Sequence, residues 1–442
     1  MKKADLNSKL REYAKNNLSP TNGEQALVSR LYMAVQSALG SSCLLIGSYA
    51  RFTSSRPLHD LDILFVAGNF EPTQLNPRRV LDGLHALLRD KFKNPTPHRL
   101  QISQQTHSVT MSFRDRDNEY FAIDVVPAFV SGIKNEFNQD IFWVPEIVNV
   151  SLRKREQRYK ELTKVKKQEI EWWIKSDPRG YIEAASRLNN LNPDFRKVVK
   201  LVKKWKHNSC EKSDAFALKS FHVEQAIFEI FRQKPTSDIS EVLFSFFCTI
   251  PSMLSHPQIR DRADITKFID QYVSDLSADQ KKTISQARDS FLIRLENVEQ
   301  NSSVSALLEA GFYQRASDSE SFLFDSSIPT YTERDALLRV VGNVRARPGF
   351  RPHTLTSDGI IDVERKIDFV SNFKGPFHID LFKWKVRNDN SSPQPRGEIT
   401  DHRTRNNPES TKYKGTHFVE CYAIRDGVCI ARNKQLVVLR SV

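Results

Sequence analysis

Cysteine is scarce in this sequence of 442 residues, which has five, at Cys43, Cys210, Cys248, Cys421 and Cys429. The number is odd, the positions are widely scattered, and none forms a CxxC pair or a Cys/His spacing that suits zinc. We therefore expect reduced thiols in the core and no zinc site built from these residues.

Long apolar runs are also missing. No stretch approaches the ~18 uninterrupted apolar residues of a membrane-spanning helix, and the start of the sequence, MKKADLNSKLREYAKNN, lacks the apolar centre of a signal peptide. We expect a soluble, cytoplasmic protein with no membrane partner. An apolar fraction of 39% and an aromatic fraction of 10% exclude wholesale disorder, and the length allows two or three domains.

Positive charge is in excess: the sequence has 66 Lys and Arg residues and 53 Asp and Glu residues, which give a formal net charge of +13. This surplus favours a polyanionic ligand, which could be nucleic acid, a nucleoside triphosphate (NTP) or a membrane surface. One basic stretch, LRKREQRYKELTKVKK, covers residues 152–167. We find no internal repeat.

The pattern of apolar residues divides the chain into three expected domains and predicts an α+β fold. In residues 1–150, a capping box at Thr21 and Glu24 starts a long spine helix, and short apolar runs then predict a mixed sheet. Residues 151–312 carry amphipathic, basic segments and few strand signals, so a helical lobe is expected there. Residues 313–442 alternate in polarity and predict a separate, mostly β domain.

Two carboxylates, Asp60 and Asp62, stand at the head of the apolar run LHDLDILFV. Side chains two apart in a strand point to the same face, so this pair can hold a cation, and carboxylate oxygens favour Mg²⁺. A third acid, Asp124, lies inside the apolar strand YFAIDVVPAF, where an uncompensated charge costs several kcal/mol. On a neighbouring strand it would complete a two-metal site for phosphoryl or nucleotidyl transfer.

A Gly-Ser pair, Gly47 and Ser48, lies twelve residues before the first of these acids. Backbone N–H groups freed by the glycine, together with the serine hydroxyl, can bind the β- and γ-phosphates of a nucleotide. The alternative is that the three acids are unrelated surface or capping residues. The spacing of the whole combination favours a nucleotide site.

The stretch GSYARFTSSRPLHDLDILFV, with IDVVPAF and FWVP further on, resembles the DNA polymerase β-like nucleotidyltransferases, and within them the cGAS/DncV-like group. One departure from that group is the pair Ser54-Ser55. The resemblance implies a polymerase β-like core, two Mg²⁺ ions for which Mn²⁺ can substitute, and catalytic, metal-binding acids at Asp60, Asp62 and Asp124. It also implies nucleotide-binding residues at Gly47, Ser48, Arg51 and Thr53.

The resemblance continues into the expected helical lobe. In DFRKVVKLVKKWKHN, Lys203 matches a lysine that reaches the triphosphate in related enzymes. The alternative is that Lys203, like the other lysines of this stretch, belongs to a solvated basic face of the helix. In LKSFHVEQ, the resemblance implies that Ser220 contacts the phosphates and that Glu224 supports it. His222 is expected to pack or bond locally, because two-metal chemistry needs no histidine.

The C-terminal segments FKWKVRND, PRGEI and ESTKYKGTHFVECYAIRDGVCIAR resemble the adenylyl/guanylyl and SMODS C-terminal sensor domain. The matching positions are Trp384, Val386, Asn388, Arg396, Gly397, Glu409, Tyr413, Gly415, His417, Glu420 and Tyr422. The resemblance implies a site for a nucleotide or another small ligand, with Trp384 and Tyr413 stacking on a base, Arg396 holding phosphate and His417 nearby. The alternative is that the aromatic residues are core and the polar ones join strand ends.

These observations lead to one main functional hypothesis: an enzyme that joins NTPs without a template into a cyclic di- or oligonucleotide second messenger. The resemblance implies a role in bacterial anti-phage signalling, with a downstream effector that recognises the product. One alternative is a nucleotidyltransferase that makes a linear product or modifies an RNA or protein acceptor. Another is an inert sensor of nucleic acid or nucleotides. Nucleic acid is not required by the first hypothesis.

Overall fold

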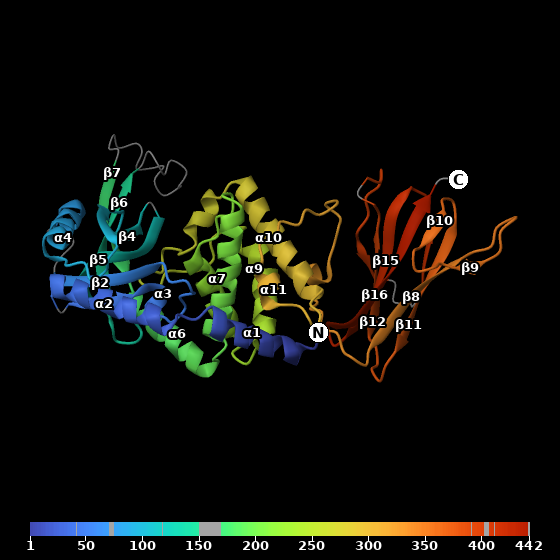
Figure 1. The fold of residues 1–442 in the computed structure, drawn as a ribbon, viewed down its shortest axis with the longest axis horizontal. Helices are drawn as coiled ribbons and strands as arrows, with labels where there is room; N and C mark the ends of the chain where they lie inside the picture. The colour runs from blue at the N-terminus through green and yellow to red at the C-terminus, as the bar shows by residue number, and fades with distance from the viewer. Residues whose placement is uncertain are drawn as a thin grey trace. The chain divides into compact units, whose positions relative to one another are not determined.

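The computed structural model describes residues 1–40, 42–69, 75–116, 118–149, 169–389, 391–401, 406–410 and 412–440 (Figure 1). The chain forms two compact units, one of Leu10–Ile284 and one of Ser285–Val442 together with Met1–Lys9. The basic stretch at 152–167 and the expected domain boundary at 150/151 lie outside the described residues.

The unit Leu10–Ile284 contains a seven-stranded mixed sheet in the order β1-β2-β5-β4-β3, with β6 pairing β5 and β7. Strands β2 and β5 run parallel, whereas β1 and β2, and β4 and β5, are antiparallel. The strands are β1 (Cys43–Ile46), β2 (Asp60–Asn69), β3 (Arg99–Gln104), β4 (Val109–Asp115), β5 (Asn118–Lys134), β6 (Asp140–Asn149) and β7 (Glu169–Ser176). The mixed sheet predicted from the sequence is therefore confirmed.

One face of this sheet carries the core, which α2 and α4 complete with Leu31, Val35 and Leu84. The predicted capping box starts α2, because Thr21 accepts from the backbone of Glu24 and the Glu24 side chain accepts in return. The helices of the unit and its borders are α1 (Lys3–Asn17), α2 (Asn22–Leu39), α3 (Gly47–Ala50), α4 (Pro77–Lys91), α6 (Pro178–Leu191), α7 (Phe195–Lys212), α8 (Ser220–Gln233), α9 (Ile239–Met253), η3 (Gln271–Asp275) and α10 (Ala278–Glu296).

Strand β7 lies in a part of the chain where the sequence predicts helices. Its residues EIEWWIKS pair along their length with β6, so this segment belongs to the sheet. Its tryptophans and isoleucines are compatible with a strand. What makes the segment a strand is its pairing with β6, which a local sequence pattern does not reveal. Helices follow directly, beginning with α6.

The helices α6 to α9 bury aromatic side chains against one another. Trp205 of α7 is fully buried and makes edge-on contacts with Phe216 and Phe247, at ring-centroid distances of 5.4 and 4.7 Å. Phe195, at the start of α7, likewise packs edge-on against Phe231 of α8. The apolar face predicted for α7 is therefore turned into this core, which leaves its basic residues on the other side.

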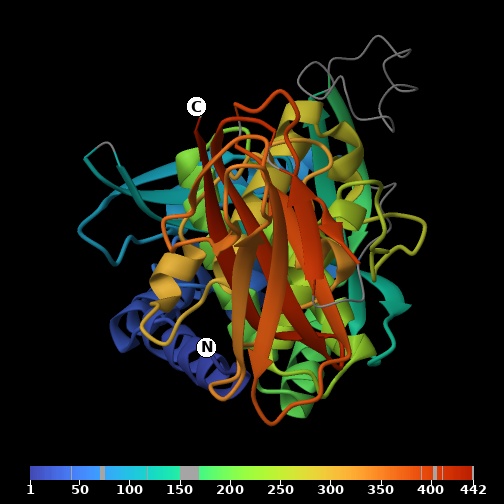
Figure 2. The same cartoon turned by 90° about the vertical axis from the view of Figure 1, so that its right-hand side faces the viewer.

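The unit that includes Ser285–Val442 is rich in β-structure, as the sequence predicts. Its strands, which face the viewer in Figure 2, form a five-stranded sheet, β10-β16-β15-β12-β13, and a four-stranded sheet, β14-β11-β8-β9. The two sheets share one core. The elements are α11 (Val304–Leu308), η4 (Leu323–Ser326), β8 (Leu337–Val344), β9 (His353–Thr354), β10 (Ile360–Asp362), β11 (Lys366–Lys374), β12 (Leu381–Arg387), β13 (Ile399–Thr400), β14 (Asn406–Ser410), β15 (Gly415–Arg425) and β16 (Val428–Arg440). The side chain of Glu409 on β14 lies outside the described residues.

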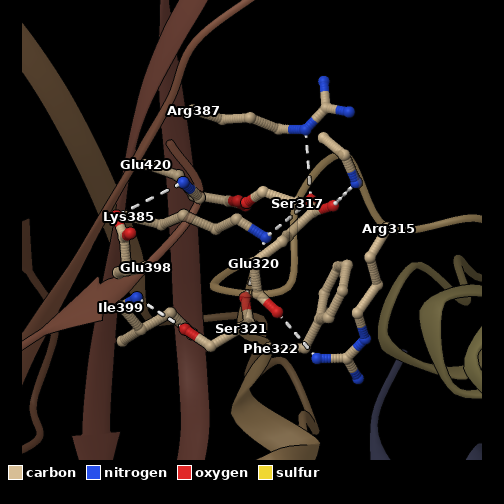
Figure 3. Close-up of polar contacts among 12 residues, drawn as sticks. Arg315, Ser317, Glu320, Ser321, Phe322, Lys385, Arg387, Glu398, Ile399 and Glu420 are labelled. Atoms are coloured by element: carbon tan, nitrogen blue, oxygen red, sulfur yellow. Dashed lines mark hydrogen bonds and ion pairs between the residues drawn. The ribbon is translucent and has the colours of Figure 1, made fainter. Parts of the chain in front are cut away.

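A buried glutamate, Glu320, joins the segment before β8 to the five-stranded sheet (Figure 3). Its carboxylate accepts from Lys385 Nζ at 3.3 Å, Arg387 Nε at 3.1 Å and the backbone N–H of Ala316 at 2.7 Å. Burial would raise the pKa of Glu320, but the backbone N–H and the two cations outweigh it and lower the pKa. The charge thus holds this segment against β12.

Each of the five cysteines lies in the described part of the chain and is a free thiol, and Cys43, Cys421 and Cys429 are buried. Within the described residues, no helix combines the length and the apolar character that crossing a bilayer demands.

Candidate active site

Strands β2 and β5 run side by side (Figure 1), and three carboxylates lie on them. Leu61 and Ile63 of β2 are fully buried in the core, so the alternating side chains Asp60 and Asp62 point to the opposite face. The parallel register sets Asp62 directly opposite Asp124. The structure therefore brings together the three acids that the sequence singles out.

Burial and like charge both disfavour the ionised form of these acids. Burial, followed by the charges of Asp60 and Asp124, raises the pKa of Asp62 to about 6. Burial also raises the pKa of Asp124, against the effect of hydrogen bonds that it accepts from Thr110 and Ser108. Such an arrangement is unfavourable unless a positive charge joins it.

The carboxylates fit a hard cation that is shared with a ligand. In the described part of the chain, no three His, Cys, Asp or Glu side chains are already arranged to hold a metal. Mg²⁺ is commonly held by one or two carboxylates, with the remaining positions taken by water and substrate phosphates. Asp62, with Asp60 and Asp124 beside it, suits that mode of binding.

The Gly47 turn lies against the acids. After β1, Gly47 has φ +68°, and a Cβ placed on it would lie 1.7 Å from Asp62 Oδ2. The carbonyl of Ser48 accepts from the backbone N–H groups of Thr53 at 2.9 Å and Ser54 at 3.1 Å, which folds the loop back on itself. Only glycine allows this backbone to approach the carboxylate so closely.

A fully buried carboxylate, Glu224 of α8, connects this loop to the helices. It accepts from Arg51 Nε at 2.5 Å, Thr53 Oγ1 at 2.8 Å and Lys203 Nζ at 3.0 Å. Burial alone would raise the pKa of Glu224, but the charges of Lys203 and Arg51 lower it to about 2. Glu224 therefore stays ionised and holds both cations.

Lys203 and Ser220, both expected to contact the phosphates, differ in whether their side chains already have partners in the protein. Lys203 lines the cleft, but its ammonium donates to Glu224 and to the carbonyl of Thr53, at 3.0 and 3.1 Å. Ser220 is exposed at the first position of α8 and also lines the cleft. Ser220 thus faces the open space, whereas Lys203 is engaged within the protein.

These groups surround a cleft of about 580 Å³, bounded by the Gly47 loop, β2, β7, α6, α7 and α8. Asp60 and Asp62 line it, and Asp124 lies beside them without lining it. The sequence analysis missed further lining residues, namely Arg56, His59, Lys175, Asp177, Tyr181, Lys204, Lys206, His207, Phe221 and Asp261. Basic residues at helical spacing, Lys200, Lys203, Lys204 and His207, are the signal that could have revealed part of this wall.

A second, smaller cavity of about 170 Å³ opens between the two C-terminal sheets. Phe369 of β11 and Val419 of β15 are among its apolar walls, and Arg396, Tyr413 and His417 are among its polar ones. Three of the four residues expected to bind a sensor ligand therefore share one cavity.

Trp384, the fourth, does not share that cavity. It is 0% exposed in the core between the sheets, so it is not available to stack on a base, and the core alternative holds for it. His417 is fixed within the loops, since its Nε2–H donates to the carbonyl of Tyr413 at 2.9 Å and its Nδ1 accepts from the N–H of Asp389 at 3.2 Å. His417 therefore shapes the cavity wall.

Comparison with protein families supports the assignment of the C-terminal region. Residues 318–440 match the family model described as the adenylyl/guanylyl and SMODS C-terminal sensor domain. The resemblance predicted for this region is confirmed. A search among curated proteins finds no match to the chain.

Several solved structures are similar to the chain. They include CdnC of E. coli MS115-1 with ATP, at 18% identity over 68% of this chain and 94% of the other and a TM-score of 0.48. The CdnE cyclic dinucleotide synthase of Elizabethkingia meningoseptica with GTP and Apcpp matches at 15% identity, over 56% and 84%, with a TM-score of 0.39. The CdnE c-UMP-AMP synthase of Rhodothermus marinus with Apcpp and Upnpp matches at 14%, over 65% and 96%, with a TM-score of 0.41. Values of this size do not identify the chain.

Replacing Gly47 by Ala should disturb the acids directly. The added Cβ would overlap Asp62 Oδ2, and the positive φ would strain an alanine, with a combined cost of about 1–3 kcal/mol. Chemical denaturation and Mn²⁺ binding followed by electron paramagnetic resonance would measure both effects. Gly83→Ala in α4 is the control, since a Cβ there meets nothing within 4 Å. Unchanged Mn²⁺ affinity in Gly47→Ala would contradict the close approach.

The raised pKa of Asp62 predicts how stability depends on pH in the metal-free protein. Because its folded pKa of about 6 lies above its unfolded value, the ionised form destabilises the fold, fully above pH 6 and not at all below pH 4. Asp62→Asn should therefore be more stable than the unmodified chain by about 3 kcal/mol at pH 8. The difference should vanish at pH 4. Urea titrations at the two pH values would measure it, and equal differences at both would contradict the prediction.

Proposed function

We propose that this chain is a template-independent nucleotidyltransferase that joins NTPs into a cyclic di- or oligonucleotide. The observation that carries the proposal is the register of β2 and β5, which sets Asp62 opposite Asp124 beside the Gly47 loop. In the reaction, a hydroxyl oxygen of one nucleotide bonds to the α-phosphorus of another, and pyrophosphate leaves.

The three acids take distinct parts in this proposal. Asp60 and Asp62, which line the cleft, would hold Mg²⁺ together with the triphosphate. When bound, Mg²⁺ supplies the charge that lowers the pKa of the acceptor hydroxyl and stabilises the leaving group. The raised pKa of Asp124 supports its role as acceptor of the hydroxyl proton.

The nucleotide phosphates would be bound by the groups that face the cleft. These are the Ser48 hydroxyl, the N–H groups of the Gly47 loop and the Ser220 hydroxyl. Lys204 and Lys206 line the same space and would supply positive charge, while Arg51, Thr53 and Lys203 keep the loop in place through Glu224. The cleft thus accounts for part of the positive surplus of the sequence.

We also propose that the product is a second messenger for a downstream effector in bacterial anti-phage defence, which the match to a sensor domain supports. A linear product, or an RNA or protein acceptor, uses the same acids and remains the enzymatic alternative. An inert sensor is the alternative of another class. It offers no reason to keep three like charges together at a thermodynamic cost.

Incubation of the purified chain with Mg²⁺ and labelled NTPs, followed by phosphatase, tests these possibilities. A product that phosphatase leaves unchanged indicates a cyclic compound, a product that loses terminal phosphates indicates a linear one, and no product indicates an inert protein. Asp60→Asn combined with Asp62→Asn should lower product formation by more than about a hundredfold, because even outer partners of a metal site are worth roughly 10–100-fold. Asp82→Asn, an exposed acid of α4, is the control. Retained synthesis in the double variant would refute the proposal.

The cavity of Arg396 and Tyr413 supports a second proposal, that the C-terminal unit binds a small, nucleotide-like ligand and thereby changes the rate of synthesis. Its apolar walls suit a planar ring, and Arg396 suits a phosphate. Such coupling requires the ligand to prefer one state of the protein over another.

Replacing Arg396 or Tyr413 by Ala should then change the rate of product formation severalfold without changing which product forms. Rates would be measured with and without cell extract. Arg345→Ala is the matched control, because Arg345 is exposed and pairs with Asp368 on the same unit, outside the cavity. If both cavity variants make product at the unmodified rate under both conditions, the unit is a scaffold.

A further inference from the structure

The start of helix α8 matters to the cleft, because Ser220, Phe221 and Glu224 all lie on its first turns and line it. A helix start exposes N–H groups that need partners, and the residue before the helix usually supplies one from its side chain. At α8 that residue is Lys219, which makes no such capping bond. Something else must fix the position of this turn.

Tyr272, from η3, contacts this helix start in another way. Its hydroxyl accepts from the backbone N–H of Lys219 at 3.0 Å, and the Lys219 ammonium lies 4.5 Å from the centre of its ring. The same hydroxyl lies 2.9 Å from Nδ1 of His222, in the first turn of α8. One side chain thus holds the residue before the helix and the third residue of the helix.

The hydrogen-bond directions follow from these contacts. A hydroxyl that accepts from Lys219 can still donate, and we assign the imidazole proton to Nε2, because this tautomer lets Nδ1 accept from Tyr272 and turns an N–H, not a lone pair, toward the Asp270 carboxylate. Nε2 faces Asp270 Oδ2 at 3.6 Å. Burial lowers the pKa of His222 to about 4, against the opposing effect of Asp270, in keeping with a neutral ring.

Asp270 anchors the far end of this chain of contacts. Its carboxylate accepts from the backbone N–H groups of Gln258 at 2.8 Å and Ile259 at 3.1 Å. Asp270 and His222 are 0% and 1% exposed, so this end of the connection is buried, whereas Lys219 at the other end is exposed. A fixed loop therefore supports the ring, and the ring supports the helix start.

We propose that Tyr272 and His222 are positioning residues for nucleotide binding, which orient the first turn of α8 so that Ser220 faces the phosphates. This inference rests on the proposed function, since it assigns these residues to the same cleft. Neither residue lines that cleft, so both act through α8. They should contribute to nucleotide affinity and little to the chemical step, because the acids belong to β2 and β5.

The test is the binding of α,β-methylene NTPs to the full-length chain with Mg²⁺, measured by calorimetry, together with KM and kcat for product formation. Tyr272→Phe removes the shared hydroxyl and should weaken binding about five- to tenfold, the scale of one net hydrogen bond. KM should rise by the same factor, while kcat changes less than about threefold. His222→Leu should behave in the same way.

Two further variants separate positioning from general destabilisation. His222→Asn keeps an acceptor near the place of Nδ1, and it should restore affinity to within about threefold of the unmodified chain. Asp238→Ala removes the capping side chain of α9 in the same unit, so it destabilises a helix start away from the cleft and should leave affinity unchanged.

The outcomes distinguish this inference from the proposed function. Binding by the unmodified chain with a selective loss in Tyr272→Phe and His222→Leu supports it. Unchanged affinity in those two variants overturns it, as does an equal loss in Asp238→Ala. No binding of any analogue by the unmodified chain overturns the proposed function itself, and this inference with it.

Discussion

The ion pair cluster around Glu224 is the interaction on which the geometry of the cleft depends. A carboxylate in a dry interior is costly by itself, and losing one partner of such a pair typically costs about 3–5 kcal/mol, because the other charge is left uncompensated. Arg51 belongs to the loop after Gly47, Lys203 to α7 and Glu224 to α8. The cluster thus joins three elements to one another, beside the glycine turn that meets Asp62.

The acids on the sheet are the electrostatic opposite of this cluster. Around Glu224 the opposing charges are matched and the pKa is lowered, whereas Asp62 has Asp60 and Asp124 as neighbours and a raised pKa. The repulsion among the acids at one wall of the cleft is therefore unfavourable, whereas the ion pairs around Glu224 at another wall are favourable. Such local cost is typical of sites that exist for a ligand rather than for stability.

Much of the site follows from patterns that are local in sequence. Alternation along β2 fixes the shared face of Asp60 and Asp62, and the isolated charge of Asp124 in an apolar strand indicates its partnership with them. The capping box of α2 and the apolar face of α7 are equally local. Each depends on chemistry within a few residues, which a sequence displays directly.

Other features depend on contacts between distant segments, and the sequence does not display those. Strand β7 becomes part of the sheet through β6, and Lys203 is engaged by Glu224 and Thr53. Trp384 matches a motif position, yet the second sheet covers it completely. In all three cases tertiary packing decides between alternatives that composition and spacing leave equally open.

The parallel pairing of β2 with β5 also has a consequence for folding. Neighbouring antiparallel strands can pair as soon as both exist, but a parallel pair requires the intervening chain, which here includes α4, β3 and β4, to close into a long loop first. Contacts of this kind form slowly and late. A partly folded chain in which β2 and β5 have not yet paired therefore lacks the acidic wall of the cleft. A ligand that binds there stabilises the folded state of the whole sheet, not of one local part.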